Sequence, residues 1–188
     1  MTRTPDQIYD EWLILRCQNG ESEALEELVG RWNERLWRHA RRLGADHEQA
    51  NDATQEAWMA IVRSLRRLED PALFRAWALR IVTNKCADQI RRVSRRRKLV
   101  DEYHQEPVTA PEGDGLAESD EDSLLRSALA GLRADRRALL GLHYLEELGL
   151  FEIALILGVP EGTVKSRLFK ARQELKEAIE RKDDEESA

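Results

Sequence analysis

The chain has 188 residues, of which 41% are hydrophobic, 35% charged and only 6% aromatic, a composition that disfavours a large β-sandwich. No apolar run approaches the roughly 18 residues of a membrane span, so we expect no membrane insertion and no export signal. The net charge of −6 predicts weak binding to free DNA, and two cysteines without a Cys-x-x-Cys pair suit a reduced, cytoplasmic protein.

The charge is distributed unevenly along the chain. Residues 1–98 carry a net charge of +4, residues 99–122 carry −9, residues 123–182 carry +3, and residues 183–188 carry −4. Helical periodicity fails in the acidic segment, which has the composition of a flexible linker. We therefore predict an all-α protein with two small helical domains, 1–98 and 123–182, a flexible acidic linker and a disordered tail.

Four helices are predicted in residues 1–98. The first places Ile8, Trp12 and Leu15 on one stripe, and the second has an apolar repeat over residues 25–40. The fourth begins at Phe74 and continues to a basic end. The third is expected to bury a stripe of small and aliphatic side chains, namely Ala50, Ala53, Ala57, Ile61 and Leu65.

Residues 153–172 have the pattern of a helix-turn-helix. Gly158 can adopt the left-handed conformation that ends one helix, and Pro160 suits the start of the next. The inward stripe of the second helix is Val164, Leu168, Ala171 and Leu175. Its outward side lacks acids after Glu161, as a DNA groove requires, whereas an ordinary solvated face usually mixes charge signs. The candidate DNA contacts are Thr163, Lys165, Ser166, Arg167, Phe169, Lys170 and Arg172.

Three motifs then resemble one known family. "EIALILGVPEGTVKSRLFKAR" resembles region 4 of the sigma-70 family, in its extracytoplasmic-function (group IV) branch. "ANDATQEAWMAI" resembles region 2.2 of that branch, and "FRAWALRIVTNKCADQIRR" resembles regions 2.3 to 2.4. The motifs follow the family order, and the resemblance covers nearly the whole chain.

The resemblance implies a promoter-specificity subunit of bacterial RNA polymerase. Region 2 would bind the clamp coiled coil of the core enzyme through Asp52, Gln55 and Glu56, and would open the −10 element. Region 4 would read the −35 element and contact the β flap. The family also implies an anti-sigma factor as a partner.

Residues for −10 recognition are expected on the fourth helix. Aromatic side chains can replace base stacking when DNA melts, Asn can pair with a base edge, and Arg can hold phosphates. The candidates are Phe74, Trp77, Arg80, Asn84, Asp88, Arg91 and Arg92. Plainer alternatives remain open: Trp77 as a core residue, Asn84 as a solvated residue, and Asp88 in an intrahelical ion pair.

Two positions depart from the family pattern. Gly149-Leu150-Phe151 stands where an N-cap hydroxyl is usual, a loss of roughly 1 kcal/mol if nothing replaces it. Lys170 stands where Arg often reads guanine, and because Lys is a point charge rather than a fork, the −35 preference could differ.

Other functions are less compatible with the sequence. The four histidines form no metal-binding or catalytic motif, and no phosphate-binding loop is present, so we expect no enzyme, no cofactor and no metal site. A sigma-like decoy that only sequesters an anti-sigma factor would have lost its DNA contacts, and a stand-alone helix-turn-helix regulator would leave residues 1–98 without a role.

Overall fold

The computed structural model describes the backbone of residues 3–99 and 120–186, and the side chains of residues 3–89 and 124–181. Its regular elements in these ranges are all helical, which confirms the predicted fold class. They form two compact units, one containing α1–α4 and the other α5–α8. The predicted acidic linker lies largely outside the described residues.

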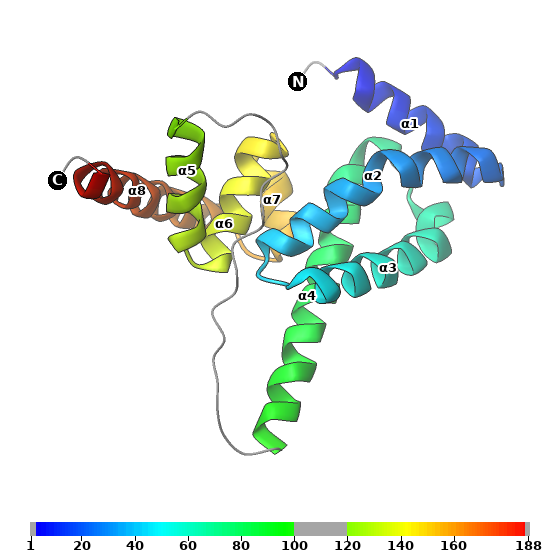
Figure 1. The fold of residues 1–188 in the computed structure, drawn as a ribbon. Coiled ribbons are helices and arrows are strands. Elements are labelled where there is room, and N and C mark those ends of the chain that lie inside the picture. The colour runs from blue at the N-terminus through cyan, green and yellow to red at the C-terminus, as the bar shows by residue number, and fades with distance from the viewer. Residues whose placement is uncertain (1–2, 100–119, 187–188) are drawn as a thin grey trace. The chain divides into compact units, whose positions relative to one another are not determined.

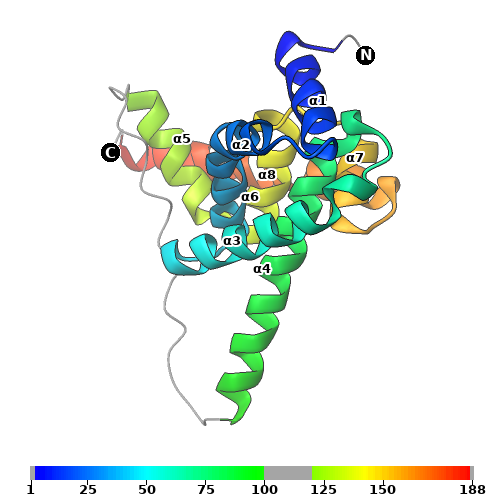
Figure 2. The same cartoon turned by 90° about the vertical axis from the view of Figure 1, so that its right-hand side faces the viewer.

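The first unit is built from four α-helices and two short 3₁₀ turns (Figure 1). The C-terminal half of α4 extends past the other helices of this unit (Figure 2). The elements are α1 (Pro5–Gln18), α2 (Ser22–Arg42), α3 (His47–Ser64), η1 (Leu65–Arg67), η2 (Pro71–Leu73) and α4 (Phe74–Leu99).

The core of this unit lies where α2 and α3 pack on α4. The predicted stripe of α3 is buried from Ala50 to Leu65, as expected. From α2, Trp32 meets Phe74 edge to face, with ring centroids 5.2 Å apart. His39, also on α2, is fully buried and its Nε2 lies 2.8 Å from Thr83 Oγ1 on α4. These contacts fix the rotation of α4 and so decide which of its residues are exposed.

The apolar stripe of α1 is exposed. Ile8 is 55% exposed, Trp12 46% and Leu15 50%, whereas Leu13 and Ile14 are buried. Two polar contacts explain this rotation. Asp10 accepts from Arg31 Nε at 2.7 Å, and Gln18 Nε2 donates to the carbonyl oxygens of Leu65 and Leu68. Because α1 has apolar residues on two faces, periodicity alone did not identify the buried one.

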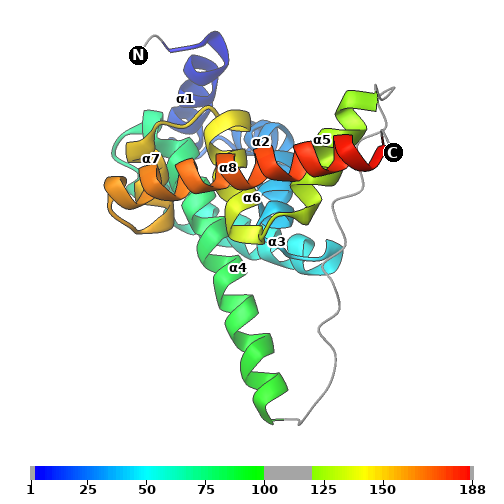
Figure 3. The ribbon, with the colours of Figure 1, turned by 90° about the vertical axis from the view of Figure 1, so that its left-hand side faces the viewer.

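The second unit consists of α5 (Asp120–Gly131), α6 (Ala134–Leu140), the π-helical turn η3 (Gly141–Leu145), α7 (Leu150–Leu157) and α8 (Glu161–Glu186). The helices α5, α6 and α7 all pack on α8, the long helix of Figure 3. The α8 backbone is helical to Glu186, past residue 182, where the sequence places the end of the domain.

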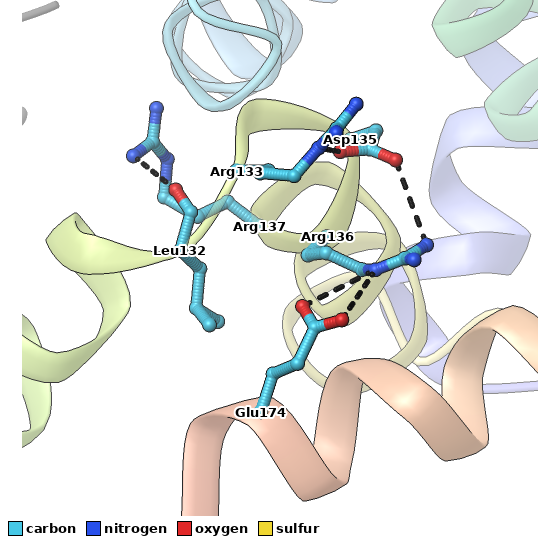
Figure 4. Close-up of polar contacts among 6 residues, drawn as sticks. All are labelled: Leu132, Arg133, Asp135, Arg136, Arg137 and Glu174. Carbon is cyan, nitrogen blue, oxygen red and sulfur yellow. Dashed lines mark hydrogen bonds and ion pairs between the residues drawn. The ribbon is translucent and has the colours of Figure 1, made fainter. Parts of the chain in front are cut away.

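Two arginines of α6 bind neighbouring helices (Figure 4). Arg137, which is 9% exposed, donates from Nη1 to the carbonyl oxygens of Ala130 and Leu132 at 3.0 Å each. These carbonyls lie at the C-terminal end of α5, where intrahelical donors are lacking. Arg136 reaches across to α8 and pairs with Glu174 at 3.3 Å. The chain thus uses buried or half-buried cations to join its helices.

Cys86 provides a test of the core around α4. It is 2% exposed, and burial raises the pKa of its thiol to about 11. At pH 8 we therefore expect only about one thiol in a thousand to be ionised, so iodoacetamide will not modify Cys86 in the folded chain. Mass spectrometry of a Cys17→Ser variant, folded and in urea, checks this, and rapid labelling of the folded chain would contradict the described core.

The same pKa has a consequence for stability. The unfolded thiol ionises near pH 8.5–9 while the folded thiol stays protonated, so this contribution is present below about pH 9 and is lost as pH rises toward 11. The advantage of the wild type over Cys86→Ala in urea unfolding should shrink by about 2–3 kcal/mol across that range.

Candidate nucleic-acid interface

The turn between α7 and α8 has the predicted helix-turn-helix geometry. Gly158 has φ +65°, in the left-handed region, and ends α7. The N–H of Val159 donates to Ala154 O, which satisfies one of the last carbonyls of the helix. Pro160 directly precedes α8 and accepts from the N–H groups of Thr163 and Val164. The missing N–H of Pro160 is therefore no loss at this position.

The start of α7 has only half of a capping box. Gly149 is the N-cap residue in extended conformation, and its N–H donates to Glu152 Oε2 at 2.9 Å. No hydroxyl is available for the N–H groups of the first turn, as the sequence predicted. Leu150 is half-buried and Phe151 is 63% exposed, so Phe151 does not cover a neighbouring helix.

Gly149→Ser should stabilise the second unit by a few tenths of a kcal/mol. The added hydroxyl can accept an N–H of the first turn, and the unfolded chain loses the freedom of glycine. A Cβ at this position would meet only Glu152 Oε2, at an ordinary 3.6 Å. Thermal unfolding followed by circular dichroism checks this, with Gly149→Ala as the variant that lacks the hydroxyl. Equal stability of the two variants would show that the cap contributes nothing.

The first half of α8 separates its side chains by face. Val164, Leu168 and Ala171 are buried, as predicted, whereas Leu175 is half-buried. The opposite face is exposed and combines hydroxyl, aromatic and cationic groups: Lys165, Ser166, Arg167, Phe169, Lys170 and Arg172. Thr163, the remaining candidate, is half-buried at the start of the helix.

The cations of this face are not neutralised. Among the side chains that the structure describes, no carboxylate pairs with Lys165, Arg167, Lys170 or Arg172. Further along α8 the signs mix, and Lys176 pairs with Glu180 at 3.5 Å. Phe169 is 62% exposed among the unpaired cations. A surface that holds unpaired positive charge beside an exposed aromatic ring suits a nucleic-acid backbone and base edges.

The exposed face of α4 holds most of the −10 candidates. Asn84, Asp88 and Arg80 are exposed and Trp77 is half-buried, and all four lie on the side of the helix opposite Leu79, Val82 and Cys86. Asp88 has an electrostatic or hydrogen-bonding partner within the protein. The side chains of Arg91 and Arg92 lie outside the described residues.

Among the described side chains, Phe74 is the member of the sequence-based list of −10 candidates that is buried. Its side chain is 2% exposed and packs edge to face on Trp32. Phe74 is therefore a core residue in this structure, which does not support its assignment as a DNA contact. The family-like motif begins at the first residue of α4, and sequence position alone does not reveal that this first turn faces inward.

The three candidates for core polymerase contact lie on α3. Asp52 and Gln55 are exposed, whereas Glu56 is half-buried and accepts from Lys85 Nζ at 3.1 Å. Asp52 and Gln55 are therefore available to a partner protein. Glu56 would have to give up its ion pair with Lys85 of α4 to bind such a partner.

Sequence reasoning missed two residues beside the candidate DNA-binding face of α8. His143 and Tyr144 lie in η3, and both contact Arg172 of α8. No helical or strand periodicity marks them, because they occupy a π-helical turn. Their proximity to Arg172 depends on packing between segments 29 residues apart.

In the described part of the chain, no helix is long and apolar enough to cross a membrane. Nor do three or more His, Cys, Asp or Glu side chains of the described ranges gather where they could hold a metal ion. The described residues thus form two helical units, the second of which contains a helix-turn-helix.

Comparisons with known proteins identify the family. The chain matches Sigma-70 region 2 over residues 28–96 and Sigma-70, region 4 over residues 122–175. It is 32% identical over 168 residues to the ECF RNA polymerase sigma factor SigM of Mycobacterium tuberculosis, covering 88% of this chain and 82% of that protein. The chain therefore belongs to the extracytoplasmic-function (ECF) branch of the sigma-70 family.

One further relative and one solved structure are also similar to the chain. The ECF RNA polymerase sigma factor SigE of Mycolicibacterium smegmatis is 34% identical over 157 residues, which are 82% of this chain and 61% of that relative. The chain thus spans less than two thirds of the length of that protein. The sigma factor RpoE, solved in complex with the anti-sigma factor NepR from Bartonella quintana, shares the fold with a TM-score of 0.71 at 24% identity, covering 83% of this chain and 96% of that one.

Proposed function

We propose that this protein is an alternative sigma factor, which directs core RNA polymerase to specific promoters and helps to open the −10 region. The observation that carries the proposal is the exposed face of α8, where Lys165, Arg167, Lys170 and Arg172 have no carboxylate partner among the described side chains. This face would enter the major groove of the −35 element, as the second helix of a helix-turn-helix does.

The first unit would open the −10 element through the exposed face of α4. Asn84 can form paired hydrogen bonds with a base edge, and Arg80 can hold a phosphate. Trp77 is half-buried beside Phe74, with ring centroids 6.1 Å apart, so part of its ring is accessible to an unpaired base. Phe74 would support Trp77 from the core rather than contact DNA.

The core enzyme would supply the attraction to DNA that an acidic chain lacks. Asp52 and Gln55 on α3 are exposed and polar, as suits a contact with the clamp coiled coil, and the second unit would meet the β flap. An anti-sigma factor is a further partner that membership of the ECF branch favours. RNA synthesis itself would belong to the polymerase.

The test is run-off transcription with purified core RNA polymerase on the DNA upstream of the gene for this protein. A transcript that depends on the added chain would establish promoter-directed initiation. If none forms although the chain binds core enzyme, templates selected from random DNA replace that promoter. Failure on every template, or failure to bind core, would overturn the proposal in favour of a decoy that only sequesters an anti-sigma factor.

A further inference from the structure

Arg172 is held in place by two side chains from outside its own helix. Its Nη2 lies 3.1 Å from His143 Nε2, and its Cζ lies 5.4 Å from the ring centroid of Tyr144. The rings of His143 and Tyr144 themselves meet edge to face, with centroids 4.8 Å apart. A guanidinium fixed by both a hydrogen bond and a cation–π contact has little freedom left to lose when a ligand binds.

His143 and Tyr144, the two partners of Arg172, are neighbours in the π-helical turn η3. The turn is closed by the N–H of Glu146, which donates to Gly141 O at 2.9 Å. Such turns are rare and occur frequently at functional sites. Here the turn directs two adjacent side chains to one arginine.

The hydrogen-bond partners of His143 indicate its tautomer. The carbonyl oxygen of Leu148, 3.1 Å from His143 Nδ1, can only accept, so Nδ1 carries the proton. Arg172 can only donate, so Nε2 is the acceptor in this contact. Because this partner is not a carboxylate, it orients Arg172 without cancelling its charge. The guanidinium thus remains available to an anion.

We infer that His143, together with Tyr144, is a positioning residue that presents Arg172 preorganised to a phosphate of promoter DNA beside the −35 element. The inference rests on the proposed function, because the anion that Arg172 would meet is the DNA backbone. Ordering a free arginine on binding would lower affinity about two- to tenfold, and the contact with His143 removes that loss.

Two substitutions of His143 separate orientation from folding. The amide of His143→Asn can still donate to Leu148 O, as Nδ1 does, but has no acceptor near Arg172. His143→Gln reaches the position of Nε2 and can present an amide oxygen to Arg172. Binding of holoenzyme to promoter DNA is measured across a range of salt concentrations for both variants, for Arg172→Ala, and for the double variant His143→Asn/Arg172→Ala.

We expect His143→Asn to lower affinity about two- to tenfold and to reduce the salt slope toward that of Arg172→Ala, although no charge has been removed. His143→Gln should restore both, and the double variant should bind no more weakly than Arg172→Ala. Nitrogen NMR of the full chain should show His143 protonated at Nδ1 and not at Nε2.

The opposite results overturn the inference. If wild type reads the promoter while His143→Asn binds with unchanged affinity and slope, or if its effect adds fully to that of Arg172→Ala, His143 does not position Arg172. A proton on Nε2 in the folded chain would exclude the described hydrogen bond. If wild-type holoenzyme fails to bind any promoter, the proposed function fails and the inference falls with it.

Discussion

Replacing Lys165, Arg167 and Lys170 together with alanine will reduce promoter-directed transcription by at least about a hundredfold. Each side chain is exposed on the outward face of α8, and no described carboxylate neutralises it. A good base contact contributes about 1–3 kcal/mol, and each lost phosphate contact lowers the salt slope of binding by about 0.9. Run-off transcription and promoter binding at several salt concentrations measure both effects.

A matched variant controls for net charge. Arg133, Lys176 and Arg181 are also exposed on the second unit, and their side chains bind Asp135, Glu180 and the carbonyl of Glu177, respectively. Replacing these three with alanine removes the same charge but none from the proposed groove face. If both triple variants lose transcription equally, then overall charge, and not the face of α8, supports DNA binding. Binding to core enzyme should be unchanged in both.

Replacing Phe74 with alanine will destabilise the first unit by about 3–5 kcal/mol. The ring is 2% exposed and packs edge to face on Trp32, so the substitution leaves a cavity and removes an aromatic pair. All five tryptophans of the chain, at positions 12, 32, 37, 58 and 77, belong to this unit. Tryptophan fluorescence during urea unfolding therefore reports the stability of this unit selectively.

Phe74→Leu distinguishes a core role from a role in DNA melting. Leucine fills much of the same space, so the loss of stability should be well below that of alanine. Transcription at a temperature where the leucine variant is folded should then be close to wild type. A variant of full stability that cannot open the promoter would show instead that Phe74 acts on DNA, and would contradict its placement in the core.

The sequence by itself determined the helical class, the helix-turn-helix and which face of its second helix is exposed. These features depend on interactions between near neighbours. Gly158 ends α7 in the left-handed conformation, Pro160 precedes α8, and the spacing of Val164, Leu168 and Ala171 defines the buried stripe. On the opposite face, the sequence contains no acidic residue between Glu161 and Arg172.

Only the tertiary structure decided which of two apolar faces is buried and which distant side chains meet. On α1, contacts of Asp10 and Gln18 with other elements turn Ile8, Trp12 and Leu15 outward. Packing of α2 on the first turn of α4 makes Phe74 a core residue. The π-helical turn that brings His143 to Arg172 has no sequence signature. In each case the physical reason is the same: the outcome depends on partners far apart in the chain, which local periodicity does not encode.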